Sequence, residues 1–151
     1  MTTKQTFSHE WSLICQRSLV DRESNLLSII DAIEQVTITV PGPVGESSDE
    51  PRISMPIHVV SRFRKLTDTG KELGLEVLYE VRNPAGKMVG DAVPVSIVMK
   101  NGIRNYRTRV TLGRVPMNSS GLYMVHVKAR EVGEVAYKRV GSAPLEVVIN
   151  R

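Results

Sequence analysis

Alternation of apolar and polar residues dominates the chain from residue 57 to its end. Between residues 75 and 81, Leu75, Val77, Tyr79 and Val81 occupy every second position. The same period of two recurs at 93–99, 106–112, 123–129 and 145–149. Successive side chains of a β-strand point to opposite faces, so this period is typical of strands with one buried face. No helical stretch separates these segments, which argues against a parallel α/β fold.

Turn signals separate the alternating segments at short spacing. They are 68–70, 83–86, 101–102, 118–121, 132–133 and 141–144. The pair Asn101-Gly102 suits a type I′ hairpin turn, because both residues tolerate positive φ. Pro84 presets φ for a tight turn at 83–86. Many short strands between such turns predict an all-β sandwich or barrel, and we favour a sandwich of two antiparallel sheets.

The first third of the chain allows two interpretations. One is a helix over 24–36, capped by Ser24 or Asn25, with an apolar face formed by Leu26, Ile29, Ile30 and Ile33. The other is two strands joined by the polar turn 21–25, with a bulge near Asp31. We favour the strands, because the segment runs into the β-branched residues of 36–40.

Residues 41–51 read as a flexible acidic loop within a single domain that spans 1–151. A chain of 151 residues can bury a full core without a metal or disulfide. The N-terminus lacks a signal-peptide pattern, and no apolar run approaches the ~18 residues of a membrane span. Cys15 is the single cysteine, so no internal disulfide forms, and we expect a cytoplasmic location.

The segment 120–127 resembles the turn and penultimate strand of an immunoglobulin-like domain. Its Ser120-Gly121-Leu122-Tyr123 places a tyrosine two residues after a turn glycine. The resemblance implies that Tyr123 bonds back to the turn as a tyrosine corner. It also implies a following hairpin, with strands near 122–131 and 134–140. The cysteine pair of antibody domains is absent, since Cys15 stands alone.

The opening segment 14–31 is similar to a family of small uncharacterised bacterial proteins. These begin with a hydrophobic strand, a Val-Asp turn and a Leu-Ser-hydrophobic strand, here at Val20-Asp21 and Leu27-Ser28. The resemblance implies a bacterial cytoplasmic protein with no assigned activity. It supports strands over 24–40 and carries over no site residue.

Catalytic, cofactor and metal chemistry find little support in the sequence. His9, His58 and His126 lie in separate segments without the spacing of metal ligands. Cys15 lies in an apolar strand pattern that predicts a small buried side chain rather than a nucleophile. Thr69-Gly70-Lys71 lacks the first glycine of a phosphate-binding loop, since Lys65 occupies that position. We therefore predict no catalytic residue, no cofactor and no metal.

Charge is divided unevenly along the chain. Residues 1–51 hold three basic and eight acidic residues, a net charge of −5, whereas 52–151 hold 17 and eight, a net charge of +9. Arginines and lysines recur on the predicted strands, at 62, 64, 65, 104, 107, 109, 114, 128, 130, 138 and 139. If Arg107 and Arg109 share a sheet face with Lys128 and Arg130, these four residues form a cationic face for an anionic partner. We favour the alternatives, in which the acidic N-terminal segment lies on a basic body and these residues form a solvated outer face that protects edge strands.

These observations favour a non-catalytic binding or assembly module. Its partner would be another protein or a second copy of itself, contacted through sheet edges and loops. One alternative is a nucleic-acid or anionic-polymer binder acting through the basic face. Such binders usually add exposed aromatic residues for stacking, and only 5% of this chain is aromatic. The other alternative is an enzyme whose site is assembled from distant residues. We expect no membrane partner.

Overall fold

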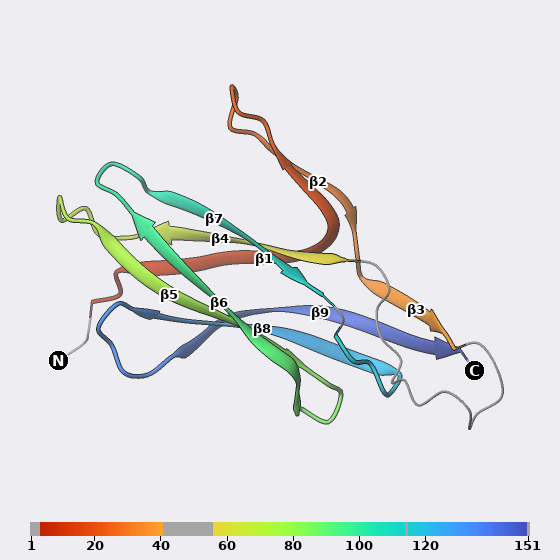
Figure 1. The fold of residues 1–151 in the computed structure, drawn as a ribbon. Helices are drawn as coiled ribbons and strands as arrows, with labels where there is room; N and C mark the ends of the chain where they lie inside the picture. Colours follow the sequence, from red (N-terminus) through yellow and green to blue (C-terminus); the bar gives the residue numbers. More distant parts are fainter. Residues whose placement is uncertain (1–3, 41–55, 114, 151) are drawn as a thin grey trace.

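The computed structural model describes residues 4–40, 56–113 and 115–150, and these residues form β-strands without any helix (Figure 1). The strands are β1 (Phe7–Val20), β2 (Leu27–Ala32), β3 (Gln35–Thr39), β4 (Ile57–Lys65), β5 (Leu73–Arg82), β6 (Met88–Met99), β7 (Asn105–Leu112), β8 (Gly121–Glu131) and β9 (Lys138–Asn150). Helices long and apolar enough to cross a membrane are therefore absent from these ranges.

The strands form two sheets. One has four strands in the order β2-β1-β4-β7, and the other has five in the order β3-β9-β8-β5-β6. The predicted all-β, two-sheet architecture is confirmed. Every pairing is antiparallel except that of β3 with β9, which is parallel. The prediction of purely antiparallel sheets is wrong at this strand, because the chain leaves β2 and joins the second sheet in the direction of β9.

The core lies between the two sheets and is built from the alternating positions. Tyr79, Tyr123 and Phe63 are its largest fully buried side chains. Leu75, Val77 and Val81 are buried on β5, as the period of two predicts. Each fully buried aliphatic side chain contributes roughly 1.5–3 kcal/mol to stability. The alternation in sequence therefore reports the inward faces of the strands correctly.

Tyr123 closes the turn that precedes β8. Its side chain is fully buried, and its hydroxyl donates a hydrogen bond of 3.0 Å to the Ser119 carbonyl oxygen. Gly121, with φ of 137°, has a backbone conformation that other residues rarely adopt. The predicted contact of Tyr123 with the 118–121 turn is confirmed.

The ambiguous first third consists of strands. β1 and β2 form a hairpin, and the chain kinks at Asp31, which has a φ of 53°. The strand interpretation is confirmed, but the segment after the turn contains two strands, β2 and β3, which belong to different sheets. The predicted bulge is absent from the pairing of β1 with β2, because the register is the same on both sides of Asp31. Residues 11–15 lie within β1. The predicted flexible loop at 41–51 lies outside the described residues.

Three local predictions are wrong. Residues 141–144 do not form a turn, because they lie within β9 and pair with β8. Asn101-Gly102 does not form a type I′ hairpin, because it joins β6 of one sheet to β7 of the other, and only Gly102 has a positive φ. A turn between sheets need not match the twist of two paired strands, so it escapes the hairpin rule. The second strand of the C-terminal hairpin begins at Lys138 rather than 134, after a longer connection.

Candidate functional site

The four residues of the predicted cationic face are divided between the two sheets. Arg107 and Arg109 lie on β7, where they alternate with the buried Thr108 and Val110. Lys128 and Arg130 lie on β8, where they flank the buried Ala129. Each pair faces outward from its own sheet, and the inner faces of these sheets pack together. The structure therefore does not bring the four residues together, because β7 and β8 belong to different sheets.

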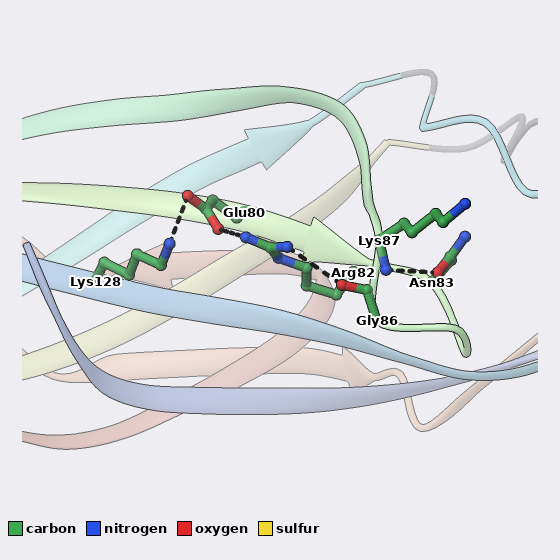
Figure 2. Close-up of polar contacts among 6 residues, drawn as sticks. All are labelled: Glu80, Arg82, Asn83, Gly86, Lys87 and Lys128. Atoms are coloured by element: carbon green, nitrogen blue, oxygen red, sulfur yellow. Dashed lines mark hydrogen bonds and ion pairs between the residues drawn. The ribbon is translucent and has the colours of Figure 1, made fainter.

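On the outer face of β5 and β8, the charge of Lys128 is compensated by a carboxylate. Glu80 of β5 accepts from Lys128 Nζ at 2.9 Å and from Arg82 at 2.7 Å, as Figure 2 shows. Arg82 also donates to the Gly86 carbonyl oxygen at 3.2 Å, in a turn where the Asn83 side chain accepts from the Lys87 amide. Burial alone would raise the pKa of Glu80, but Lys128 and Arg82 outweigh it and hold that pKa below its usual value.

Arg130 is engaged in the same way. Its Nε donates to Glu76 of β5 at 2.6 Å, and a second nitrogen donates to the Val135 carbonyl oxygen at 2.8 Å. Its guanidinium lies 4.3 Å from the centre of the Tyr137 ring. The β8 half of the predicted face is thus occupied by partners within the chain. Glu76 and Glu80 both lie on β5, and the antiparallel pairing of β5 with β8 places them beside these basic residues.

The β7 half has a different neighbour. Arg107 lies directly opposite Arg62 of β4 in the antiparallel register. Arg62 and Arg64 both contact Glu10 of β1, at 3.2 and 3.6 Å. The sequence shows basic residues on both strands, but no local pattern shows that β4 and β7 are adjacent.

A turn with its own hydrogen bonds joins β1 to β2. The Asp21 carboxylate accepts from the backbone amides of Ser24 and Glu23, at 2.6 and 3.0 Å, and from the Ser24 hydroxyl at 2.8 Å. These bonds, first among them that of the Ser24 amide, lower the pKa of Asp21. Asn25 follows with a φ of 55°, which asparagine tolerates better than most residues.

The β1–β2 hairpin stands out from the sheets (Figure 1) and is tied to β7 by both arginines. Arg107 donates to the Asn25 backbone and side-chain oxygens at 2.9 and 2.6 Å, and Arg109 donates to the Ser18 carbonyl oxygen at 3.1 Å. The N-terminal third thus reaches these two arginines, but it offers them neutral oxygens rather than carboxylates.

Two buried side chains lie on β1 and β4, outside the core between the sheets. Cys15 and Val60 are fully buried, yet neither belongs to the cluster between the sheets. Val60 alternates with the core residue Val59, so it points to the outer side of its sheet. Burial, partly opposed by the charge of Arg109, raises the pKa of the Cys15 thiol. This confirms the prediction that Cys15 is a small buried side chain.

A groove of about 470 Å³ lies between the hairpin and the outer face of the four-stranded sheet. Apolar and polar residues divide its lining, which consists of Trp11, Leu13, Leu27 and Ile29 together with Asn25, Arg62 and Arg107. The groove can therefore hold an apolar group next to an anionic one. Of these residues, sequence reasoning singled out only the two arginines as charged candidates.

Several polar side chains form hydrogen bonds with one another near β1. His9 Nε2 lies 2.7 Å from Ser12 Oγ, which lies 2.6 Å from Ser61 Oγ, and the Tyr79 hydroxyl lies 2.6 Å from Thr108 Oγ1. Burial lowers the pKa of His9, against the effect of a backbone hydrogen bond at Trp11. These bonds satisfy polar groups at the edge of the core. In the described ranges, no carboxylate orients His9 as it would in a serine hydrolase triad.

The three histidines remain apart in the fold. His9, His58 and His126 lie on β1, β4 and β8, and His58 Nδ1 lies 3.0 Å from the Thr111 hydroxyl. Across residues 4–40, 56–113 and 115–150, no group of three or more histidine, cysteine or acidic residues is placed to hold a metal ion.

Of the remaining basic candidates, Arg104 contacts Asp68 at 3.5 Å, and Arg114 lies outside the described residues.

No family model matches this sequence. No curated protein matches it. Among solved structures, the chain is similar to the N-terminal domain of PorA, with 8% sequence identity and a TM-score of 0.28. The similarity covers 92% of this chain and 97% of that one. A TM-score this low does not define a shared fold.

Proposed function

We propose that this chain is a non-catalytic protein-binding module with an immunoglobulin-like sandwich fold, and that the β1–β2 hairpin is its binding element. Three features support the immunoglobulin-like part. β9, β8 and β5 are neighbours in one sheet, β4 and β7 are neighbours in the other, and Tyr123 forms a tyrosine-corner bond at the start of β8. The hairpin is an addition to that plan.

The observation that carries the proposal is the concentration of exposed apolar side chains on the hairpin. Its exposed residues are Leu19, Val20, Leu26 and Ile30. Leu26 is 68% exposed and Leu19 is 59% exposed. Scattered exposed apolar residues are ordinary on a protein surface, but a group on one projecting element marks an interaction site.

The open outer edge of β2 also supports the hairpin as the binding element. β2 is the last strand of the four-stranded order, so none of the described strands pairs with its outer edge. Such an edge offers backbone N–H and C=O groups to another extended chain. Addition of a strand to a sheet edge is a recurring mode of protein recognition. The hairpin thus combines an apolar surface with an open edge.

Affinity capture from the source cells tests the proposal with three forms of the chain. The hairpin variant is Leu19→Ser with Leu26→Ser, and the control is Val132→Ser with Val135→Ser in the β8–β9 connection. Val132 and Val135 are 66% and 92% exposed, so both variants remove exposed apolar groups. Each should change stability by no more than about 0.5 kcal/mol per site.

The expected result is that the wild type and the control retain the same partner, whereas the hairpin variant loses it. Sedimentation of the three purified forms measures their oligomeric state, and so it shows whether the partner is a second copy of the chain or another protein. Retention of the partner by the hairpin variant at wild-type levels would contradict the proposal.

A further inference from the structure

Arg62 and Arg107 form a like-charge pair across β4 and β7. They are directly opposite in register on the same outward face. Like charges in this position destabilise a sheet unless partners compensate for them. Arg62 is compensated by Glu10 at 3.2 Å, but the hydrogen-bond partners of Arg107 are the two neutral oxygens of Asn25. The Arg107 end of the groove therefore keeps a positive charge.

The two outer faces of the protein differ in this respect. On the five-stranded sheet, Glu76 and Glu80 receive Arg130, Lys128 and Arg82. On the four-stranded sheet, one carboxylate, Glu10, serves both Arg62 and Arg64. Neither Arg107 nor Arg109 has a salt bridge to any described residue. Positive charge without a salt bridge to a described residue thus lies beside the hairpin groove, and on the other sheet Arg139, opposite Lys128, likewise has no salt bridge to a described residue.

The groove sets this charge next to apolar walls. Trp11 and Leu13 of β1 line it on the sheet side, and Leu27 and Ile29 of β2 line it on the hairpin side. A guanidinium binds a carboxylate through paired, charge-assisted hydrogen bonds, and it does so most strongly where water is partly excluded. The groove is complementary to a carboxylate with an apolar group close by.

We propose that the groove binds an extended acidic segment of a partner protein, in which an acidic and an apolar residue are two positions apart. This inference rests on the proposed function, because it assigns a chemistry to the segment that pairs along β2. Residues two apart in a strand project to the same face about 6.5–7 Å from each other. One side chain would reach Arg107 and Arg62, and the other would pack on Trp11 and Leu27.

Trp11 provides a direct readout, since it is the single tryptophan of the chain and lines the groove. The probe is the capped peptide acetyl-Thr-Leu-Thr-Glu-Thr-Leu-Thr-amide, titrated while Trp11 emission is recorded. Two matched peptides carry Gln or Lys in place of Glu. We expect saturable binding of the Glu peptide, about tenfold weaker binding of the Gln peptide, and none of the Lys peptide.

Asn25→Asp is the sharpest variant. It keeps the size of the side chain and its tolerance of positive φ, but it places a carboxylate of the chain itself on Arg107. We expect it and Arg107→Gln each to weaken the Glu peptide by about tenfold or more. The control is Arg139→Gln, which removes one exposed arginine charge from β9 and should leave binding unchanged. Thermal melts establish that each variant is folded.

Equal affinity for the Glu and Gln peptides, or wild-type affinity in Asn25→Asp, would overturn the inference. So would saturation of the Trp11 signal by a single-stranded oligonucleotide when the Glu peptide gives none, since that result assigns the groove to nucleic acid. Partner capture that depends on Leu19 and Leu26 without any peptide binding would overturn the inference and leave the proposed function standing. Binding of the Glu peptide, together with partner capture that does not depend on Leu19 and Leu26, would overturn the proposed function and leave the groove chemistry standing.

Discussion

Arg107 donates from one guanidinium nitrogen to both the backbone and the side-chain oxygen of Asn25, at 2.9 and 2.6 Å. The two residues are 82 positions apart, so this contact fixes the turn of the first hairpin over the seventh strand. Asn25 holds a positive φ and offers no charge, so one residue shapes the turn and leaves the arginine cationic.

Two substitutions at position 25 separate the shape of the turn from the contact with Arg107. Asn25→Gly keeps the positive φ and loses the side-chain acceptor, whereas Asn25→Ala loses both. The left-handed conformation costs a non-glycine residue roughly 1–2 kcal/mol. Hydrogen exchange of the β2 amides should therefore accelerate more in Asn25→Ala than in Asn25→Gly. Equal acceleration would show that backbone conformation plays no part.

The tyrosine corner should contribute measurably to stability. Tyr123→Phe removes the hydroxyl that donates to the Ser119 carbonyl oxygen. We expect a loss of about 1 kcal/mol in the free energy of unfolding, measured by urea denaturation. Tyr106→Phe is the control, because this partly buried tyrosine has no hydrogen bond from its hydroxyl to any described residue. Matching losses in the two variants would remove the special role of the corner.

Gly141 is required for the packing of β9 against β1. A Cβ at this position would overlap the Cε1 and Nδ1 atoms of the His9 ring, which packs edge-on against Phe63. Gly141→Ala should lower the unfolding free energy by about 1–3 kcal/mol. Gly113→Ala, with nothing near its Cβ, should change it by less than about 0.5 kcal/mol. Wild-type stability of Gly141→Ala would disprove the close contact with His9.

Histidine burial predicts a pH dependence of stability. Burial lowers the pKa of His9 from 6.5, so the unfolded chain takes up a proton before the folded one as the pH falls. This contribution to stability is complete above pH 6.5 and is lost as the pH falls through the folded pKa. Burial, aided by Arg139 and Arg82, lowers the pKa of His126 in the same direction.

Urea denaturation across this pH range measures the effect. As the pH is lowered, we expect the free energy of unfolding to decrease in the wild type and to decrease less in His9→Gln. In the double variant with His126→Gln, it should change little with pH. A slope in the double variant equal to that of the wild type would assign the pH dependence to other groups.

The sequence predicted the faces of the strands better than the neighbours of the strands. Alternation at Leu75, Val77 and Tyr79 depends only on local geometry, and those side chains are buried. The β-branched residues after position 35 correctly favoured a strand over a helix. In contrast, the parallel pairing of β3 with β9 joins residues more than a hundred positions apart, and no local pattern encodes it.

The same limit applied to the candidate site. Outward positions for Arg107, Arg109, Lys128 and Arg130 followed from alternation, but their division between two sheets did not. The opposition of Arg62 and Arg107 depends on β4 lying beside β7. Asn25 was visible in the sequence as a turn residue or a helix cap. Its role as the partner of Arg107 required the fold.

Hydrogen–deuterium exchange of the chain, with and without the captured partner, tests the central claim most directly. The account predicts slower exchange on binding in the β1–β2 hairpin, over residues 17–30, and no change in the β8–β9 connection at 132–137. Protection confined to the β8–β9 connection or to the outer face of β5 and β8, with the hairpin unchanged, would contradict it.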